Sequence, residues 1–220
     1  MTGRSDGAGR PDGDVPAGPD DGPEIVDLRA LLERPGPGSH RMTLRIGGQD
    51  VETLADLPPA RGGLLFVGLN PSPVSVTAGH YHQGTLGRRF WERLRTIGIL
   101  PAGVPVESAD DAIVAAGHGI TDLLKLPTAR DEASDDDLRA GVGGLWQKIA
   151  LWRPAAVVFI YKRGAEIAAG RPIAEPWGHL VGVALAGRPC FLMPGPYARS
   201  KEVREGLNLL RNLVASLPRE

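Results

Sequence analysis

Two uninterrupted apolar runs constrain the fold of this chain more than any other feature. The first is LLFVGL over residues 64–69, and the second is AAVVFIY over residues 155–161. A strand that is apolar on both faces needs cover on both sides, which is typical of the parallel sheets of α/β proteins. Helical patterns follow both runs. We therefore predict a three-layer α/β/α sandwich with a central, mainly parallel sheet of about four strands.

The other predicted elements alternate in the same way. Amphipathic spacing predicts a helix over residues 86–97 with Gly98 as its C′ residue. A second helix is predicted to begin at Ser134, which forms a loose capping box with Asp137, and to end at Trp152 before a proline. Further strands are predicted at residues 119–124 (or a turn there), 180–184 and 190–193, and further helices at residues 162–169 and 203–214.

The N-terminal segment has a different composition from the rest of the chain. It is rich in Gly, Pro and Asp, so we expect a disordered acidic tail over residues 1–38, with one short helix near residues 24–36, and a single domain over residues 39–220. Residues 1–40 hold four of the 25 basic and eight of the 26 acidic side chains, which leaves 21 basic and 18 acidic side chains for the domain. A mildly basic domain is compatible with DNA as a partner.

Cysteine content and hydropathy limit the class of protein further. Cys190 is the only cysteine, which excludes an internal disulfide and a four-cysteine zinc or iron–sulfur centre within one chain. No apolar run approaches the roughly 20 residues of a membrane span, and no signal-peptide pattern opens the sequence. We expect a monomeric cytoplasmic protein, associated with the nucleoid if the source is bacterial, with no membrane partner.

Two polar loops are predicted to meet at one edge of the sheet, because ligands bind beyond the carboxyl ends of parallel strands. One is NPSPVSVTAGHYH (residues 70–82) and the other is PGPYARSK (194–201). The predicted domain over residues 39–220 contains no G-x-S-x-G, no H-E-x-x-H, no Walker A lysine and no G-x-G-x-x-G after a strand. His80, His82 and His118 fall near the loops without a metal-ligand spacing, so we predict neither a metal nor another cofactor.

Four ordered segments of the sequence resemble the mismatch-specific uracil and thymine DNA glycosylases of the uracil-DNA glycosylase superfamily. GLNP (68–71), followed by GHY (79–81) and RFW (89–91), is similar to the first motif of that family. GITDLLKLPT (119–128) and the segment at residues 175–199 are similar to its middle segment and to its final strand and loop. The resemblance spans about residues 53–211. It implies a monofunctional enzyme that hydrolyses the N-glycosidic bond of uracil, or of a related mispaired or damaged pyrimidine, in double-stranded DNA.

The resemblance also implies roles for individual residues. Asn70 would be the catalytic residue, because its amide can orient the attacking water and hold the base through its amino group; the alternative is a turn residue before Pro71. The base would contact Gly68, Leu69, Ser72 and Ser75, and would stack on Tyr81 or His82, of which we favour Tyr81 unless it only packs the loop. The DNA-contacting residues would be Gly195, Pro196, Tyr197, Arg199, Ser200 and Lys201, with Tyr197 and Arg199 at the wedge positions.

The sequence departs from the family pattern at two positions. Ser72 replaces the usual glycine after the first motif, and Gly195 replaces the usual serine of the second motif. These departures leave open a glycosylase-fold module that binds damaged or abasic DNA with little catalysis. A third alternative is an unrelated α/β enzyme acting on a nucleotide or a small acid, in which Asn70 would only shape a turn.

Overall fold

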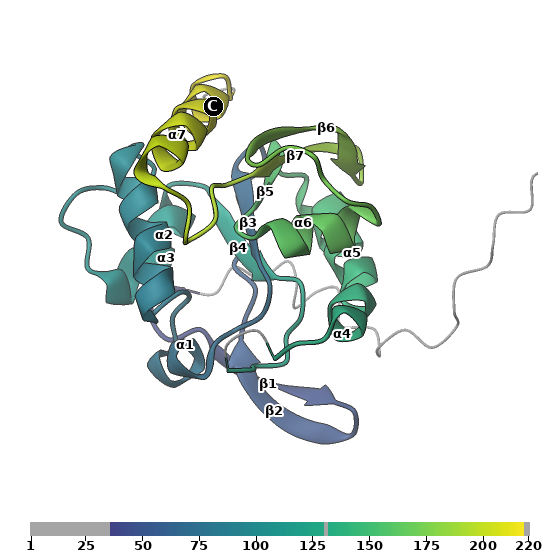
Figure 1. The fold of residues 1–220 in the computed structure, drawn as a ribbon. Helices are drawn as coiled ribbons and strands as arrows, with labels where there is room; N and C mark the ends of the chain where they lie inside the picture. The colour runs from purple at the N-terminus through teal and green to yellow at the C-terminus, as the bar shows by residue number, and fades with distance from the viewer. Residues whose placement is uncertain (1–35, 130–131, 218–220) are drawn as a thin grey trace, which may run out of the picture.

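The computed structural model describes residues 36–129 and 132–217 (Figure 1). Nearly all of the predicted acidic tail, including its short helix, lies outside the described residues. The first described element is a hairpin that the sequence analysis did not predict, in which β1 (Arg41–Ile46) pairs antiparallel with β2 (Gln49–Leu54).

A five-stranded sheet forms the middle of the domain. Its strand order is β4-β3-β5-β7-β6. β3 (Leu64–Gly68) pairs parallel with β4 (Gly119–Asp122) and β5 (Ala156–Phe159), and β5 pairs parallel with β7 (Arg188–Leu192). β6 (Gly178–Leu185) closes the edge in an antiparallel pairing. The predicted α/β/α class with a mainly parallel sheet is confirmed, with five strands in place of about four.

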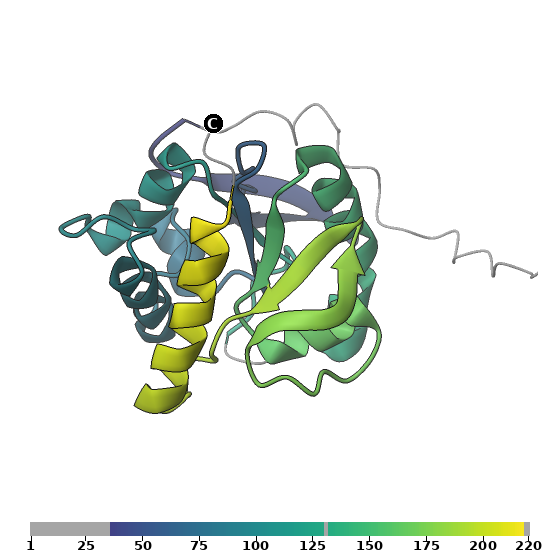
Figure 2. The ribbon, with the colours of Figure 1, turned by 90° about the horizontal axis from the view of Figure 1, so that it is seen from above.

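Alternate side chains of β3 belong to two separate cores, one on each face of the sheet. The helices on one face are α2 (Thr85–Thr96), α3 (Ala109–Ala115) and α7 (Ser200–Ala215), and those on the other are α4 (Asp135–Ala140), α5 (Val142–Trp152) and α6 (Lys162–Ala169). Leu64 and Phe66 belong to the core shared with α2, α3 and α7, whereas Leu65 and Val67 belong to the core shared with α4, α5 and α6. Figure 2 shows these two groups of helices on either side of the strands.

The segment predicted as one helix from Ser134 to Trp152 is two helices that meet at Gly141. The capping box of Ser134 and Asp137 is present at the start of α4. A Cβ at residue 141 would lie 1.9 Å from the backbone oxygen of Leu123. The close approach of that chain segment requires a glycine, and the break between α4 and α5 falls at the same residue.

The carboxyl edge of the sheet is where the connections diverge. The segments after β3 and β7 lead to helices on one face, and those after β4 and β5 lead to helices on the other. Divergent connections at this edge form the crevice in which α/β proteins bind ligands. The short helix α1 (Pro73–Ala78), which was not predicted, follows β3 at this edge and is capped by Ser72.

Candidate active site

Two arginines of α2 join the loop after β7 to the first motif. The guanidinium of Arg93 donates to the backbone oxygens of Pro194 and Gly195, the latter at 2.9 Å. Arg89 Nη1 donates to the oxygen of Pro196 at 3.0 Å. These hydrogen bonds fix the start of the second loop against the helix that follows the first loop.

Asn70 is half-buried immediately beyond the end of β3. Its side-chain Nδ2 donates to Thr128 Oγ1 at 2.7 Å and to the backbone oxygen of Leu126 at 3.2 Å. Because a carbonyl can only accept, the contact with Leu126 fixes which end of the amide faces the β4 side. The amide oxygen points away from these acceptors. Thus the amino group that was predicted to hold the base is already occupied, and the oxygen is the end left for an incoming water.

The other first-loop residues largely build the loop itself. The backbone oxygens of Gly68 and Leu69 accept from the N–H groups of the two residues that follow β4, at 3.1 and 2.9 Å. Ser72 Oγ accepts from the backbone N–H of Ser75 and donates to its hydroxyl at 2.9 Å. The Ser75 hydroxyl also accepts from the N–H of Gln83 at 3.1 Å, and Ser75 is only 3% exposed. Ser72 and Ser75 therefore hold the loop in shape.

Tyr81 and His82, the two candidates for stacking on a base, lie in different surroundings. Tyr81 is 1% exposed, and its hydroxyl donates to the backbone oxygen of Ala55 at 2.9 Å and accepts from Lys125. It offers no free ring face in this structure, which matches the loop-packing alternative. His82 is half-buried, and its buried Nε2 has no partner among the described residues. Burial lowers the pKa of His82 to about 4, so the ring is neutral near pH 7.

Asp122 is a site residue that the sequence analysis missed. It ends β4 in register with Gly68, and both carboxylate oxygens are buried without a partner among residues 36–129 and 132–217. A Cβ at residue 68 would lie 2.2 Å from Asp122 Oδ1 and 3.6 Å from His82 Cε1, so these two side chains converge on Gly68. Burial raises the pKa of Asp122 to about 6, against the nearby ammonium group of Lys125.

The lysines near Asp122 are bound to a different carboxylate. Asp56 accepts from Lys125 Nζ at 2.5 Å and from Lys148 Nζ at 2.8 Å, and from the hydroxyl of Thr121 at 2.6 Å. Burial raises the pKa of Asp56, but the two ammonium groups outweigh it and hold the pKa far below its usual range. Asp56 is thus a satisfied structural anion, and Asp122 is left without a partner beside it.

The second loop presents most of its predicted DNA-contacting residues to solvent. Tyr197 is 80% exposed, and Arg199, Ser200 and Lys201 are exposed around the first turn of α7. The backbone N–H of Arg199 donates to the Glu202 carboxylate at 2.8 Å. Gly195 and Pro196 are half-buried, and their backbone oxygens are the ones bound by the α2 arginines.

The model of one protein family, described as the uracil DNA glycosylase superfamily, matches residues 55–214 of this chain. This match covers most of the sequence and includes both loops and all five strands of the central sheet. The chain belongs to the uracil DNA glycosylase superfamily. Membership confirms the superfamily predicted from the motifs and identifies the chain as a DNA glycosylase, a hydrolase of DNA repair that acts on DNA. It also removes the alternative of an unrelated α/β enzyme.

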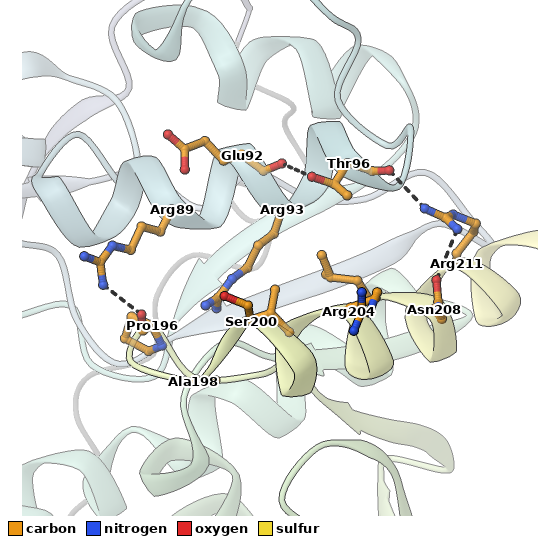
Figure 3. Close-up of a pocket in the computed structure, with 12 residues that line it drawn as sticks. Arg89, Glu92, Arg93, Thr96, Pro196, Ala198, Ser200, Arg204, Asn208 and Arg211 are labelled. Atoms are coloured by element: carbon orange, nitrogen blue, oxygen red, sulfur yellow. Dashed lines mark hydrogen bonds between the residues drawn. The ribbon is translucent and has the colours of Figure 1, made fainter.

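A basic groove of about 730 Å³ runs between α2 and α7 of this superfamily member, next to the second loop (Figure 3). Four arginines line it: Arg89, Arg93, Arg204 and Arg211. Figure 3 shows Arg211 bonded to Thr96 and Asn208, whereas Arg204 makes none of the hydrogen bonds drawn. The groove is separate from Asn70 and is suited to the phosphate backbone of DNA.

The described part of the chain contains no helix long and apolar enough to cross a membrane.

Proposed function

We propose that this superfamily member is a monofunctional glycosylase that removes uracil, or a related mispaired or damaged pyrimidine, from double-stranded DNA. The observation that carries the proposal is the fixed amide of Asn70. Its amino group is held by Leu126 and Thr128, and its oxygen is therefore directed as an acceptor for one water. The substrate range rests on the resemblance of the first and second motifs to the mismatch-specific enzymes.

The reaction needs a positioned water more than a strong base. The C1′–N1 bond breaks as the sugar takes on oxocarbenium character, and the base leaves with the bonding electrons. The water held by Asn70 Oδ1 forms the new C1′–O bond and releases a proton, and the departing base takes up a proton from solvent. A neutral amide orients the water but stabilises the cationic sugar less than a carboxylate does, so we expect a slow enzyme.

We place the extruded base against His82 and Asp122. His82 Nε2 and both oxygens of Asp122 are buried without partners among the described residues. Buried polar atoms without partners cost about 1–3 kcal/mol each, and the hydrogen-bonding edge of a pyrimidine is a suitable partner for them. Of Tyr81 and His82, this arrangement favours His82 as the residue that contacts the base, through a hydrogen bond in place of the predicted stacking, since Tyr81 is fully packed.

We assign the wedge that fills the duplex after base extrusion to Tyr197 and Arg199. Both side chains are exposed on a loop whose first residues are hydrogen-bonded by Arg89 and Arg93. We predict that Arg199→Ala weakens excision from duplex substrates more than from single strands, because only a duplex has a gap to fill. Excision rates on paired and unpaired versions of one oligonucleotide measure this difference. Equal losses on both would remove the wedge role.

The substrate proposal is tested by excision from a panel of duplexes. Labelled duplexes with uracil, thymine, hypoxanthine or etheno-cytosine are incubated with the protein and treated with alkali, which breaks the strand at abasic sites. We expect strand breakage at uracil or another pyrimidine lesion, lost in Asn70→Ala. Breakage only at hypoxanthine would contradict the pyrimidine preference.

The same assay separates an enzyme from a binding module. If the wild type breaks no duplex above the Asn70→Ala background and yet binds an abasic duplex tightly, the binding alternative that Ser72 and Gly195 left open is the correct one.

A further inference from the structure

Four potential metal ligands converge at a place that the proposed reaction does not use. His40 precedes β1, His80 follows α1, and Asp110 and Asp111 lie in the first turn of α3. One ligand atom from each of the four side chains lies within 4.8 Å of every other. The ligands come from three separate segments, and so no local spacing in the sequence reveals the cluster.

The distances fit a four-coordinate ion. His40 Nε2 lies 2.9 Å from Asp111 Oδ1 and 3.8 Å from Asp110 Oδ2, and His80 Nδ1 lies 2.9 Å from Asp110 Oδ1. Four ligands at 2.0–2.1 Å from a tetrahedral zinc ion are spaced by roughly 3.3 Å, so small adjustments of these side chains would enclose one ion. Two imidazole nitrogens and two carboxylate oxygens are a donor set that zinc accepts.

Backbone groups orient the two carboxylates from outside the cluster. The N–H of Tyr81 donates to Asp110 Oδ2 at 2.8 Å, and the N–H of Gly38 donates to Asp111 Oδ2 at 3.1 Å. Hydrogen bonds of this kind hold ligating carboxylates in place around metal ions. Asp110 is therefore already positioned, although its side chain has no exposed surface.

The cluster combines two carboxyl groups with little solvent. The side chains of His40 and Asp110 are 1% and 0% exposed. Buried charge requires compensation. A divalent cation bound between the two carboxylates would supply that compensation.

We infer that His40, His80, Asp110 and Asp111 form a structural site for a divalent transition-metal ion of the zinc type. The ion ties the segment before β1 and the loop containing His80 to the start of α3. The backbone N–H of Tyr81 donates a hydrogen bond to Asp110, and His82 is the next residue in the sequence. The site therefore also fixes the loop that the proposed function places beside the base. The metal site does not depend on the identity of that base.

The test is metal content and thermal stability of the full chain. The protein is stripped with a chelator, exchanged into metal-free buffer and titrated with Zn²⁺, and bound metal is counted by elemental analysis. Co²⁺ in place of Zn²⁺ reports four-coordination through its visible spectrum. We expect one ion per chain and a rise in Tm of at least about 5 °C at zinc concentrations 100-fold above Kd.

Variants distinguish the cluster from adventitious binding. We expect His80→Gln and Asp111→Asn each to lower zinc affinity at least about tenfold and to reduce the zinc-dependent rise in Tm to about half or less. The matched control is His179→Gln, an exposed histidine on β6, which should bind zinc as the wild type does. Less than stoichiometric zinc in the wild type, or equal binding by His80→Gln and the wild type, would overturn the inference. Both readouts are independent of base excision.

Discussion

Among single residues, Asp122 is the buried carboxyl group whose two oxygens both lack a hydrogen-bond partner in the described part of the chain. The two neighbouring lysines are bound to Asp56, so the carboxylate of Asp122 ends β4 in a buried position without a hydrogen-bond donor among the described residues. Its raised pKa follows from that placement. Groups that cost stability in the free protein are common at binding sites, where the ligand supplies the missing partner.

The stability of Asp122→Asn relative to the wild type tests this environment. A carboxyl whose folded pKa is about 6 and whose unfolded pKa is near 3.9 destabilises the fold as pH rises from about 4 to 6, because the unfolded state releases the proton more easily. We therefore expect Asp122→Asn to exceed the wild type in unfolding free energy by up to about 3 kcal/mol at pH 7.5, and to lose that advantage near pH 4.

Denaturant unfolding of both proteins at the two pH values measures this difference. The side chains of Asp56, Lys125 and Lys148, which face Asp122, are identical in both proteins. If the stability of Asp122→Asn relative to the wild type falls between pH 4 and pH 7.5, the ionised carboxylate of Asp122 is stabilised in the folded protein. Asp122 would then have a partner.

At the scale of elements, α2 connects the two functional loops. One end of the helix follows the His82 loop, and its arginines bind the oxygens of residues 194–196 from the second loop. The position of the proposed wedge therefore depends on side chains about 100 residues earlier in the sequence.

Arg93→Met should loosen the second loop without unfolding the domain, because methionine keeps the apolar stem and loses the donors. We expect faster amide hydrogen exchange at residues 195–199 and weaker binding to duplex DNA. Arg88→Met is the matched control, because Arg88 is exposed on the same helix and its substitution removes the same charge. Equal losses of DNA binding in the two variants would show that Arg93 contributes charge alone.

Helices and strands could be predicted from the sequence where contacts between nearby residues determine them. Continuous apolar runs such as residues 64–69 identify central strands, and residues 162–169 were predicted with their observed bounds. The break at Gly141 could not be predicted because it depends on the carbonyl of Leu123. The β1–β2 hairpin was missed although residues 41–46 alternate polar and apolar side chains and Gly47-Gly48 is a two-residue turn signal. Asp122 and the His40 cluster became apparent only when distant segments came together.

At the scale of the whole molecule, the charge of the chain is unevenly distributed. The net charge is −1, but four arginines line the groove between α2 and α7. We propose that this groove contacts the DNA backbone, so affinity for DNA should depend on salt through release of counterions.

Arg204→Gln should weaken duplex binding for all sequences alike and reduce the slope of log K against log salt concentration by about one. Arg204 is exposed in the groove beside the second loop. The control is Arg61→Gln, which removes an exposed arginine just before the amino end of β3, at the opposite edge of the sheet. Binding titrations at several salt concentrations give both slopes, and an equal change in the two variants would place the DNA elsewhere.

We propose that the oxygen of Asn70 positions the water that cleaves the glycosidic bond. The most direct measurement is the single-turnover rate of base release from a uracil-containing duplex by Asn70→Ala, with duplex affinity measured in parallel and Thr77→Ala, an exposed residue of α1, as the control. We expect a rate at least about 100-fold lower for Asn70→Ala with little change in affinity, and an unchanged rate for Thr77→Ala. A rate for Asn70→Ala equal to that of the wild type would contradict it.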